Sequence, residues 1–237
     1  MINLDRLEDA LEKLNINRKV DYDKFEKYMI GILEWNEKVN LTNITDHDEF
    51  IEKHYIDSIV IANQDEFIEA DKIIDVGTGG GFPGVPLAIL FPEKNFILLD
   101  SLNKRLKIIN QLTNEIGINN VTTIHGRAEE LAKKPELRES FDMCLSRAVA
   151  NLTSLSELCI PFVKKNGTFI AYKGPGINEE LENAQKAIEI LGGSISKIED
   201  VNINNNMEHK LLFINKIKNT PKKYPRKPGE PIRNPIK

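Results

Sequence analysis

The sequence IIDVGTGGGFPG occupies residues 73–84 and is the stretch that decides the fold of this chain. The stretch begins with a mostly apolar, strand-like run at 73–76 that leads into the glycines, and the apolar segment 85–91 that follows is helix-like. Glycines at such a turn let backbone N–H groups approach a ligand closely, because no Cβ intervenes. In an open α/β sheet this turn lies at the carboxyl ends of the strands, where ligands bind. The stretch therefore predicts a strand, a ligand-binding turn and a helix, in that order.

Short apolar segments alternate with amphipathic helical patterns from this turn onward. The expected strands are Lys72–Val76, Asn95–Leu99, Val121–Ile124, Phe141–Ser146 and Thr168–Tyr172. We expect Ser101 to cap a helix that Gly117 ends. In the same way, we expect Asn178 to cap a later helix that Gly192 ends. Such alternation predicts a parallel sheet with helices on both faces.

The two ends of the chain differ from this alternating part. Two strand-like runs, Ile195–Ile203 and Lys210–Ile217, are joined by the polar stretch Asn204–Glu208, which predicts an antiparallel hairpin at the sheet edge. Before the sheet, a helical face is formed by Phe25, Tyr28, Met29, Ile32 and Leu33. Asp46 and Glu49 predict a capping box at the start of a second helix. The expected organisation is a helical region at 1–70, a Rossmann-like α/β domain at 71–217 and a basic, Pro-rich tail at 218–237.

Composition excludes several classes of protein. Of 237 residues, 41% are apolar and 29% are charged, which is typical of soluble globular proteins, and the net charge of −4 excludes a wholly basic nucleic-acid coat protein. The two cysteines, Cys144 and Cys159, provide neither a disulfide framework nor a Cys-rich zinc module, and we assign no metal. The apolar runs are too short to span a membrane, and the acidic start is unlike a signal peptide. A cytoplasmic location is the expectation.

Charge is concentrated at the carboxyl-terminal end. Residues 216–237 include eight Lys or Arg against one acid, whereas the remainder carries 24 basic and 35 acidic residues. A basic end on an acidic body favours an arm for a polyanion. Two other interpretations stay open: a solvated, disordered tail, which the prolines favour, and a segment that packs on the body.

Two cofactors are compatible with the glycine turn. Gly79, Gly81 and Gly84 match the dinucleotide fingerprint, which predicts an NAD-binding oxidoreductase. Asp75, two residues before a G-x-G-x-G run, is instead similar to the first motif of S-adenosylmethionine (SAM) methyltransferases. Asp100 serves both interpretations, since both ligands present ribose hydroxyls. An acid at the turn suits the ammonium and sulfonium of SAM and would repel a pyrophosphate, so SAM is favoured.

Several short motifs, taken in order, resemble one family of enzymes. They are WN at 35–36, NLT at 40–42, HYIDS at 54–58, the stretch 75–86, LDS at 99–101, KR at 104–105, AE at 128–129, SRA at 146–148, YKG at 172–174 and KKYPRKPG at 222–229. Over nearly its whole length the chain resembles the bacterial small-subunit rRNA guanine-N7 methyltransferases, the RsmG (GidB) family. The resemblance implies a class I SAM-dependent methyltransferase fold, SAM as cofactor, and one guanine in the 530 loop of 16S rRNA as substrate.

The resemblance also implies which residues form the cofactor site. Ala128 and Glu129 match a pair that contacts the adenine end, and Arg147 matches an arginine that lines the pocket. Asp100 takes the ribose role by similarity to the wider class. The complete set expected at the cofactor is Gly77, Thr78, Gly79, Phe82, Asp100, Ser101, Ala128, Glu129 and Arg147.

The chemistry of guanine N7 limits what the protein must supply. N7 has an in-plane lone pair, so it can attack a sulfonium methyl without first losing a proton. No general base is therefore assigned, and catalysis is expected to consist of in-line positioning with water excluded. Positioning roles are expected for Arg147, Lys173 and His54, whereas Cys144 and Cys159 are expected to be packing residues.

Basic residues near the turn and in the tail provide the expected RNA contacts. They are Lys104, Arg105, Lys222, Lys223, Arg226 and Lys227, with Tyr224 as a stacking ring. The expected partner is 16S rRNA or the small ribosomal subunit, and the chain is expected to be a monomer. Because little basic surface is predicted, an assembled or partly assembled subunit is the expected substrate. A non-catalytic module with the same pocket, or a methyltransferase for a protein or small molecule, stays open, since the sheet does not fix the acceptor.

Overall fold

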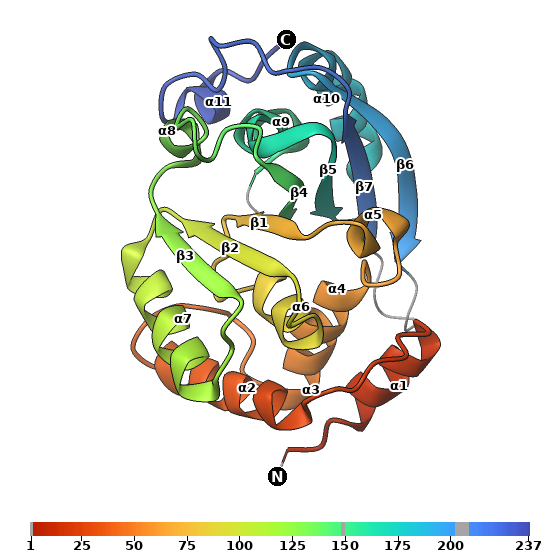
Figure 1. Cartoon of the computed structure of the whole chain (residues 1–237), viewed down its shortest axis with the longest axis vertical. Helices are drawn as coiled ribbons and strands as arrows, with labels where there is room; N and C mark the ends of the chain where they lie inside the picture. The colour runs from red at the N-terminus through yellow and green to blue at the C-terminus, as the bar shows by residue number, and fades with distance from the viewer. Residues whose placement is uncertain (1, 148–149, 202–208) are drawn as a thin grey trace.

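The computed structural model describes residues 2–147, 150–201 and 209–237. The expected hairpin connection Asn204–Glu208, the expected strand end Ile203 and the motif residue Ala148 lie outside the described residues. Figure 1 shows the chain with its helices and strands labelled.

The described residues form one seven-stranded sheet with the order β3-β2-β1-β4-β5-β7-β6. Its strands are β1 Lys72–Val76, β2 Asn95–Asp100, β3 Val121–His125, β4 Phe141–Arg147, β5 Val163–Lys173, β6 Gly193–Val201 and β7 His209–Lys216. The first five strands pair in parallel, and β7 runs antiparallel to both β5 and β6. The predicted parallel sheet with a terminal hairpin is confirmed. β5 differs from the expectation, since it begins at Val163 rather than at Thr168.

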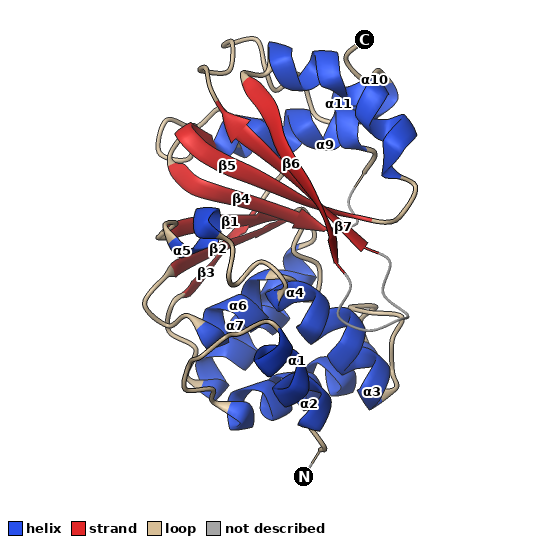
Figure 2. Cartoon of the chain, turned by 90° about the vertical axis from the view of Figure 1, so that its right-hand side faces the viewer, coloured by secondary structure: helices blue, strands red, loops and turns tan. Residues whose placement is uncertain are grey.

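Helices cover both faces of the sheet, as Figure 2 shows. Before the sheet lie α1 Asp5–Lys13, α2 Tyr22–Asn36, α3 His47–Phe50, the π-helical turn η1 Ile51–Ile56, α4 Asp57–Ile59 and α5 Asp65–Ile68. Within and after it lie α6 Gly84–Leu90, α7 Asn103–Ile116, α8 Ala128–Leu131, α9 Leu152–Cys159, the 3₁₀ turn η2 Ile160–Phe162, α10 Ile177–Ile190 and α11 Glu230–Arg233.

Each face of the sheet has its own hydrophobic core. The first core unites α1, α2 and η1 with α6, α7 and one face of the sheet. The second core lies between the other face and α8, α9 and α10, and it contains Cys144 and Cys159 as buried side chains. The helices that precede the sheet therefore share a core with it.

Most predicted helix ends are confirmed, and two are wrong. The Asp46 carboxylate accepts a hydrogen bond from the Glu49 N–H at 2.9 Å, and Gly117 ends α7 in the left-handed conformation with φ 75°. Ser101 does not cap α7, because Asp100 Oδ1 binds the Leu102 N–H at 2.8 Å and the helix begins after Leu102. Asn178 lies inside α10, which already begins at Ile177.

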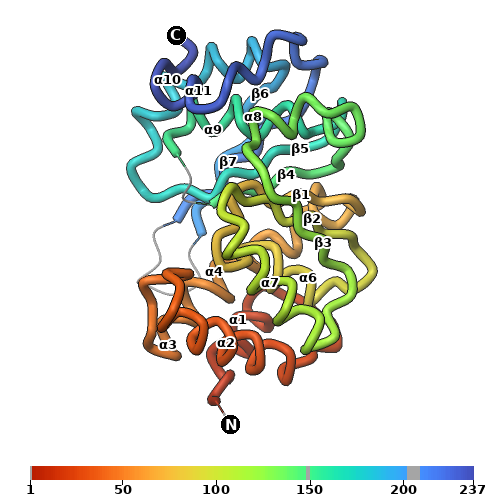
Figure 3. The backbone as a smooth tube through the Cα atoms, turned by 90° about the vertical axis from the view of Figure 1, so that its left-hand side faces the viewer, coloured from red at the N-terminus to blue at the C-terminus, as the bar shows by residue number. Residues whose placement is uncertain are grey.

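The C-terminal segment, residues 218–237, packs against the body of the protein. Figure 3 shows it on the side of the sheet that carries α8 and α9. The guanidinium of Arg138 donates to the carbonyl oxygens of Thr220 at 2.8 Å and Tyr224 at 2.9 Å. Arg226 is paired with Glu157, a fully buried carboxylate of α9, through hydrogen bonds of 2.6 to 3.1 Å. Among the described residues, no helix is long and apolar enough to cross a membrane.

Candidate functional site

A cavity of about 760 Å³ lies at the carboxyl ends of β1 to β4, where the glycine turn was expected to place a ligand. Its wall is built from the turn after β1, the end of β2, the start of α8, the end of β4 and the loop before α3. Every residue expected at the cofactor lines it: Gly77, Thr78, Gly79, Phe82, Asp100, Ser101, Ala128, Glu129 and Arg147. We call it the first cavity.

The glycine turn is held from beneath by Asp75. Asp75 Oδ2 accepts hydrogen bonds from the Thr78 hydroxyl at 2.7 Å and the Gly84 N–H at 3.0 Å. Asp75 is buried and does not line the first cavity, so its direct role is to shape the turn. Burial raises its pKa to about 6, although the two hydrogen bonds oppose this shift. Its Oδ1 is buried with no hydrogen-bond partner among the described residues.

The open side of the turn is fixed by Asp100, which ends β2. One carboxylate oxygen accepts from the Gly79 N–H at 3.0 Å, and the other accepts from the Leu102 N–H. Gly79 has φ +60°, and a Cβ there would meet nothing within 4 Å, so this backbone borders open space. A ligand can therefore approach the peptide units of the turn directly.

Helix α2 also supports the glycine turn, through the side chain of Tyr28. The buried Tyr28 hydroxyl donates to the Gly80 carbonyl oxygen at 2.9 Å. Gly81 has φ +90°, and a Cβ there would lie 2.3 Å from the Tyr28 hydroxyl oxygen. Only glycine fits at this position, both in backbone conformation and in space.

The motif residues Asn40–Thr42 belong to the loop after α2 and line the first cavity, whereas the motif residues 35–36 end α2 itself. Asn36 Oδ1 accepts from the N–H groups of Leu41 at 2.8 Å and Thr42 at 3.0 Å, so the side chain of α2 folds the loop over the site. Thr42 Oγ1 lies 2.6 Å from His54 Nε2. The imidazole of His54 stacks on Phe82, with ring centroids 4.3 Å apart.

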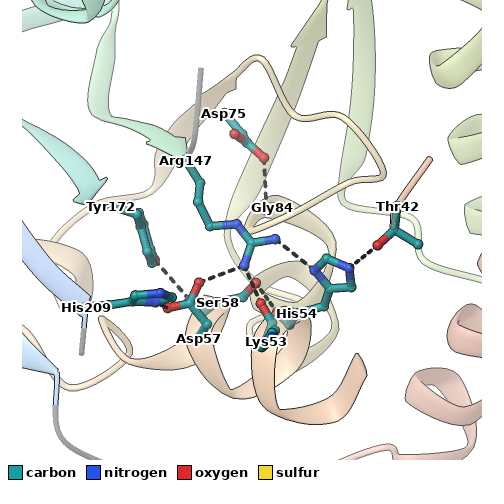
Figure 4. A network of polar contacts seen from close by, with 10 residues as sticks. All are labelled: Thr42, Lys53, His54, Asp57, Ser58, Asp75, Gly84, Arg147, Tyr172 and His209. Atoms are coloured by element: carbon teal, nitrogen blue, oxygen red, sulfur yellow. Dashed lines mark hydrogen bonds and ion pairs between the residues drawn. The ribbon is translucent and has the colours of Figure 1, made fainter. Parts of the chain in front are cut away.

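Arg147 connects β4 to the helix that carries His54, as Figure 4 shows. Its Nη1 donates to Asp57 Oδ2 at 2.7 Å and to the Lys53 carbonyl oxygen at 2.7 Å, and its Nη2 lies 3.1 Å from His54 Nδ1. Burial, together with the charge of Arg147, lowers the pKa of His54 to about 3. His54 is therefore neutral at physiological pH. Nδ1 accepts from Arg147, so Nε2 carries the proton and donates to Thr42.

Asp57 joins this network to the hairpin. Its Oδ1 accepts from His209 Nδ1 of β7 at 2.7 Å, while Oδ2 holds Arg147. Burial alone would raise the pKa of Asp57, but the hydrogen bond from His209 and the charge of Arg147 outweigh it and hold the pKa below its ordinary value. The hydrogen bond to Asp57 also raises the pKa of His209, against the effect of burial.

A second cavity of about 410 Å³ adjoins the first at His54 and Arg147, which line both. It is lined by Lys53, His54, Asp57, Arg147, Tyr172, Lys173, Gly174, Glu180 and His209. The expected residue Lys173 lies here, with its Nζ 2.6 Å from Glu180 Oε2 and 2.9 Å from the Ala150 carbonyl oxygen. The three residues expected to position ligands, Arg147, Lys173 and His54, thus meet at one place.

The basic residues expected at RNA are dispersed. Lys104, Lys222, Lys223 and Lys227 are exposed. Arg105 lines the first cavity, and its Nη2 donates to the Asn40 carbonyl oxygen at 3.3 Å. Arg226 is engaged by Glu157, and Tyr224 is buried, so neither side chain is presented to a ligand as expected.

Sequence reasoning did not assign Asp57, Thr42 or His209 to the site. Asp57 follows His54 by three residues, a spacing that places both on one helix face and could have indicated it. His209 has no such local signal, because only the pairing of β7 with β5 brings it to Asp57. Among the described residues, no group of three or more His, Cys, Asp or Glu could hold a metal ion.

Comparison with known proteins identifies the family. A family model described as rRNA small subunit methyltransferase G matches residues 21–211. The chain belongs to this family. It is 53% identical over 216 residues to ribosomal RNA small subunit methyltransferase G of Clostridium novyi, covering 91% of this chain and 89% of the relative. The protein of the same name from Clostridium tetani is 50% identical over 217 residues, covering 91% of each. Membership of the methyltransferase G family removes the oxidoreductase alternative.

Solved structures confirm the fold of this methyltransferase G chain. A putative O-methyltransferase from Klebsiella pneumoniae superposes with a TM-score of 0.54 at 12% identity, covering 81% of this chain and 90% of that one. The structure of M. jannaschii TYW2 in complex with AdoMet gives 0.51 at 17% identity, covering 68% and 77%. The class I methyltransferase fold predicted from the sequence is thus confirmed.

Proposed function

We propose that this chain binds SAM in the first cavity and transfers its methyl group to N7 of a guanine held in the second cavity, a guanine of the 530 loop of 16S rRNA. One observation carries the proposal: the two cavities adjoin at His54 and Arg147. A donor in one cavity and an acceptor in the other would meet there, as in-line transfer requires.

The residues of the first cavity fit SAM. Asp100 and Glu129 are buried carboxylates, suited to ribose hydroxyls and to an adenine amine. The open backbone at Gly79 allows close approach of the ligand. The unpaired Oδ1 of Asp75 beneath the turn adds negative potential, which favours a cationic ligand. When bound, SAM supplies a methyl group activated by a sulfonium.

The polar groups where the cavities meet suit a nucleophile that needs no base. Both nitrogens of His54 are engaged, one by Arg147 and one by Thr42. An arginine fork would otherwise bind guanine O6 and N7 together and block N7. Here Asp57, His54 and the Lys53 carbonyl hold the fork of Arg147, which supports an N7 that stays accessible. Lys173 and His209 provide donors for O6 or a phosphate in the second cavity.

The cofactor part of the proposal is tested by binding of S-adenosylhomocysteine, measured by calorimetry. Gly77→Val and Asp100→Ala are expected to abolish binding. Gly77 has φ 77°, so the valine variant also carries backbone strain, whereas Asp100→Ala is expected to leave the fold largely intact, as checked by circular dichroism. Wild-type affinity in either variant would refute the cofactor site.

The acceptor part is tested by mapping the methylated base after reaction with small ribosomal subunits. Methylation of N7 in the 530 loop is expected, and faster on subunits than on naked transcript. Methylation elsewhere, or SAM binding without transfer to subunits, would overturn the acceptor assignment. A monomeric state and a cytoplasmic location stay predictions.

A further inference from the structure

We propose that the C-terminal segment forms the outer wall of the adenine end of the first cavity, with Ile232 covering the adenine ring and the Gly229 N–H orienting Glu129. This inference rests on the cofactor site proposed above and goes beyond it, because the segment was expected to serve as an arm for RNA.

The first observation concerns exposed apolar side chains. Ile232 lines the first cavity and is 54% exposed, and Leu102, which lines the same cavity, is 52% exposed. Among the described residues, the large apolar side chains that are exposed at all are Ile30, Ile68, Leu102, Ile198, Ile217 and Ile232, and only Ile68 matches the exposure of Leu102 and Ile232. Two of them line this one cavity. A flat purine between Ile232 and Leu102 would remove both from water, which is favourable in proportion to the area covered.

The second observation concerns Glu129. Its side chain is buried, and its Oε1 accepts a hydrogen bond from the Gly229 N–H at 2.8 Å. Oε2 accepts no hydrogen bond from the described residues and is left for the exocyclic amine of adenine. Gly229 has φ +78°, a conformation that turns its N–H toward α8 and that other residues adopt with strain.

The third observation is that the segment is fixed in place on both sides of Gly229. Before it, Arg226 is bound to the buried carboxylate of Glu157. After it, the Ser154 hydroxyl donates to the Pro231 carbonyl oxygen at 2.8 Å. Both anchors lie on α9, which shares the second core with the sheet. The two anchors on α9 therefore hold Ile232 at the cavity.

The decisive variant is Ile232→Ser, compared with Ile68→Ser, which removes the same side chain at the same exposure of 54% from α5, outside the first cavity. Measured by calorimetry, the affinity of Ile232→Ser for S-adenosylhomocysteine should be roughly fivefold lower than that of the wild type. Its affinity for methylthioadenosine, which lacks the amino-acid end, should fall by the same factor. Ile68→Ser should match the wild type for both ligands. Equal affinities in Ile232→Ser and Ile68→Ser would overturn the proposal. Asp100→Ala distinguishes failure of this inference from failure of the proposed cofactor site. Unchanged ligand affinity in Asp100→Ala would refute the cofactor site itself.

The orienting role of Gly229 is tested with S-inosylhomocysteine, in which a carbonyl oxygen replaces the adenine amine. The wild type should bind it less tightly than S-adenosylhomocysteine, because an acceptor would face Oε2 of Glu129. Gly229→Ala and Glu129→Gln should each reduce this discrimination, and the double variant should reduce it no further than Glu129→Gln alone. Undiminished discrimination in Gly229→Ala, or additive effects in the double variant, would refute the coupling.

Discussion

Arg147 and Asp57 form an ion pair of 2.7 Å at the wall between the two cavities, with side-chain exposures of 15% and 2%. The pair joins β4 to the helix that also carries His54, and Asp57 extends it to His209 of the hairpin. Three parts of the chain that are distant in sequence thus meet at one carboxylate.

Removal of the charge of Asp57 should be costly. Asp57→Asn would leave the guanidinium of Arg147 buried without its counter-charge, and we expect a loss of about 3 kcal/mol in the free energy of unfolding. Methyl transfer should fall as well, because Arg147 would no longer be held away from the acceptor. Denaturant unfolding and a methylation assay measure both effects. Asp200→Asn, at an exposed ion pair with Lys210, should change stability by less than about 0.5 kcal/mol. Equal losses in the two variants would contradict the role given to Asp57.

Stability should depend on pH through His209. Its pKa in the folded state lies above the ordinary value of 6.5, because of the hydrogen bond to Asp57. The stabilisation is therefore complete below the unfolded-state pKa and is lost as the pH rises through the raised folded-state pKa. The difference in unfolding free energy between wild type and His209→Asn should shrink from pH 6 to pH 9. A difference that stays constant over this range would show that His209 does not titrate against Asp57.

Tyr28 should link α2 to cofactor affinity. Tyr28→Phe leaves the buried Gly80 carbonyl oxygen without its partner, and we expect a loss of about 1–2 kcal/mol in stability, together with weaker S-adenosylhomocysteine binding. Tyr55→Phe is the matched control, since this buried hydroxyl donates to the Phe25 carbonyl oxygen at 2.6 Å and not to the turn, and the ring that packs near Phe82 is kept. The control should lose stability to a similar extent and keep its affinity for the ligand. Weakened binding in both variants would indicate a general effect of destabilisation.

Two glycines of the turn should respond differently to alanine. Gly81→Ala brings a Cβ to 2.3 Å from the Tyr28 hydroxyl oxygen at φ +90°, and a loss of about 3 kcal/mol is expected. Gly79→Ala meets no atom within 4 Å at φ +60°, so only backbone strain of roughly 1 kcal/mol applies. Its methyl group would, however, occupy the space needed by the ligand. Thermal unfolding and calorimetry should show that Gly81→Ala mainly loses stability and Gly79→Ala mainly loses binding; the reverse order would refute this account of the turn.

The exposed lysines of the C-terminal segment should contribute to RNA binding and not to cofactor binding. Replacement of Lys222, Lys223 and Lys227 by alanine should weaken binding to small subunits and lower the slope of log affinity against log salt by about 2. Affinity for S-adenosylhomocysteine should stay at the wild-type value. A triple variant at Lys13, Lys19 and Lys27, in the helical region, is the control for net charge. Equal weakening in both triple variants would assign the effect to charge alone.

The sequence predicted those parts of the site that depend on local chain geometry. The strand, glycine turn and helix around Asp75 follow from residues that are adjacent in sequence, and Asp100 follows from the same α/β repeat. The contact between Asp57 and Arg147 spans 90 residues, and that between Asp57 and His209 spans 152, so no local pattern encodes them.

The C-terminal segment was predicted less well, for a physical reason. Its lysines and prolines favour a solvated arm when charge alone is considered. Its fixed position depends on Glu157 of α9. All eight residues of this helix, LTSLSELC, are buried, so the carboxylate of Glu157 needs a cation as its partner. The acid at position 157, between leucines of this helix, could have indicated that a basic residue such as Arg226 would pair with it and fix the segment to the body of the protein.

The support of the glycine turn by Tyr28 has a consequence for engineering. Gly31 of the same helix lies so close to α7 that a Cβ there would come within 2.4 Å of Leu112, and these helices share one core with the sheet. The first seventy residues are thus not a detachable recognition module. Chimaeras that exchange these residues between distant homologues should express poorly unless the glycine turn and α7 are transplanted with them. The reason is that the side chains of α2 pack closely against both of these parts.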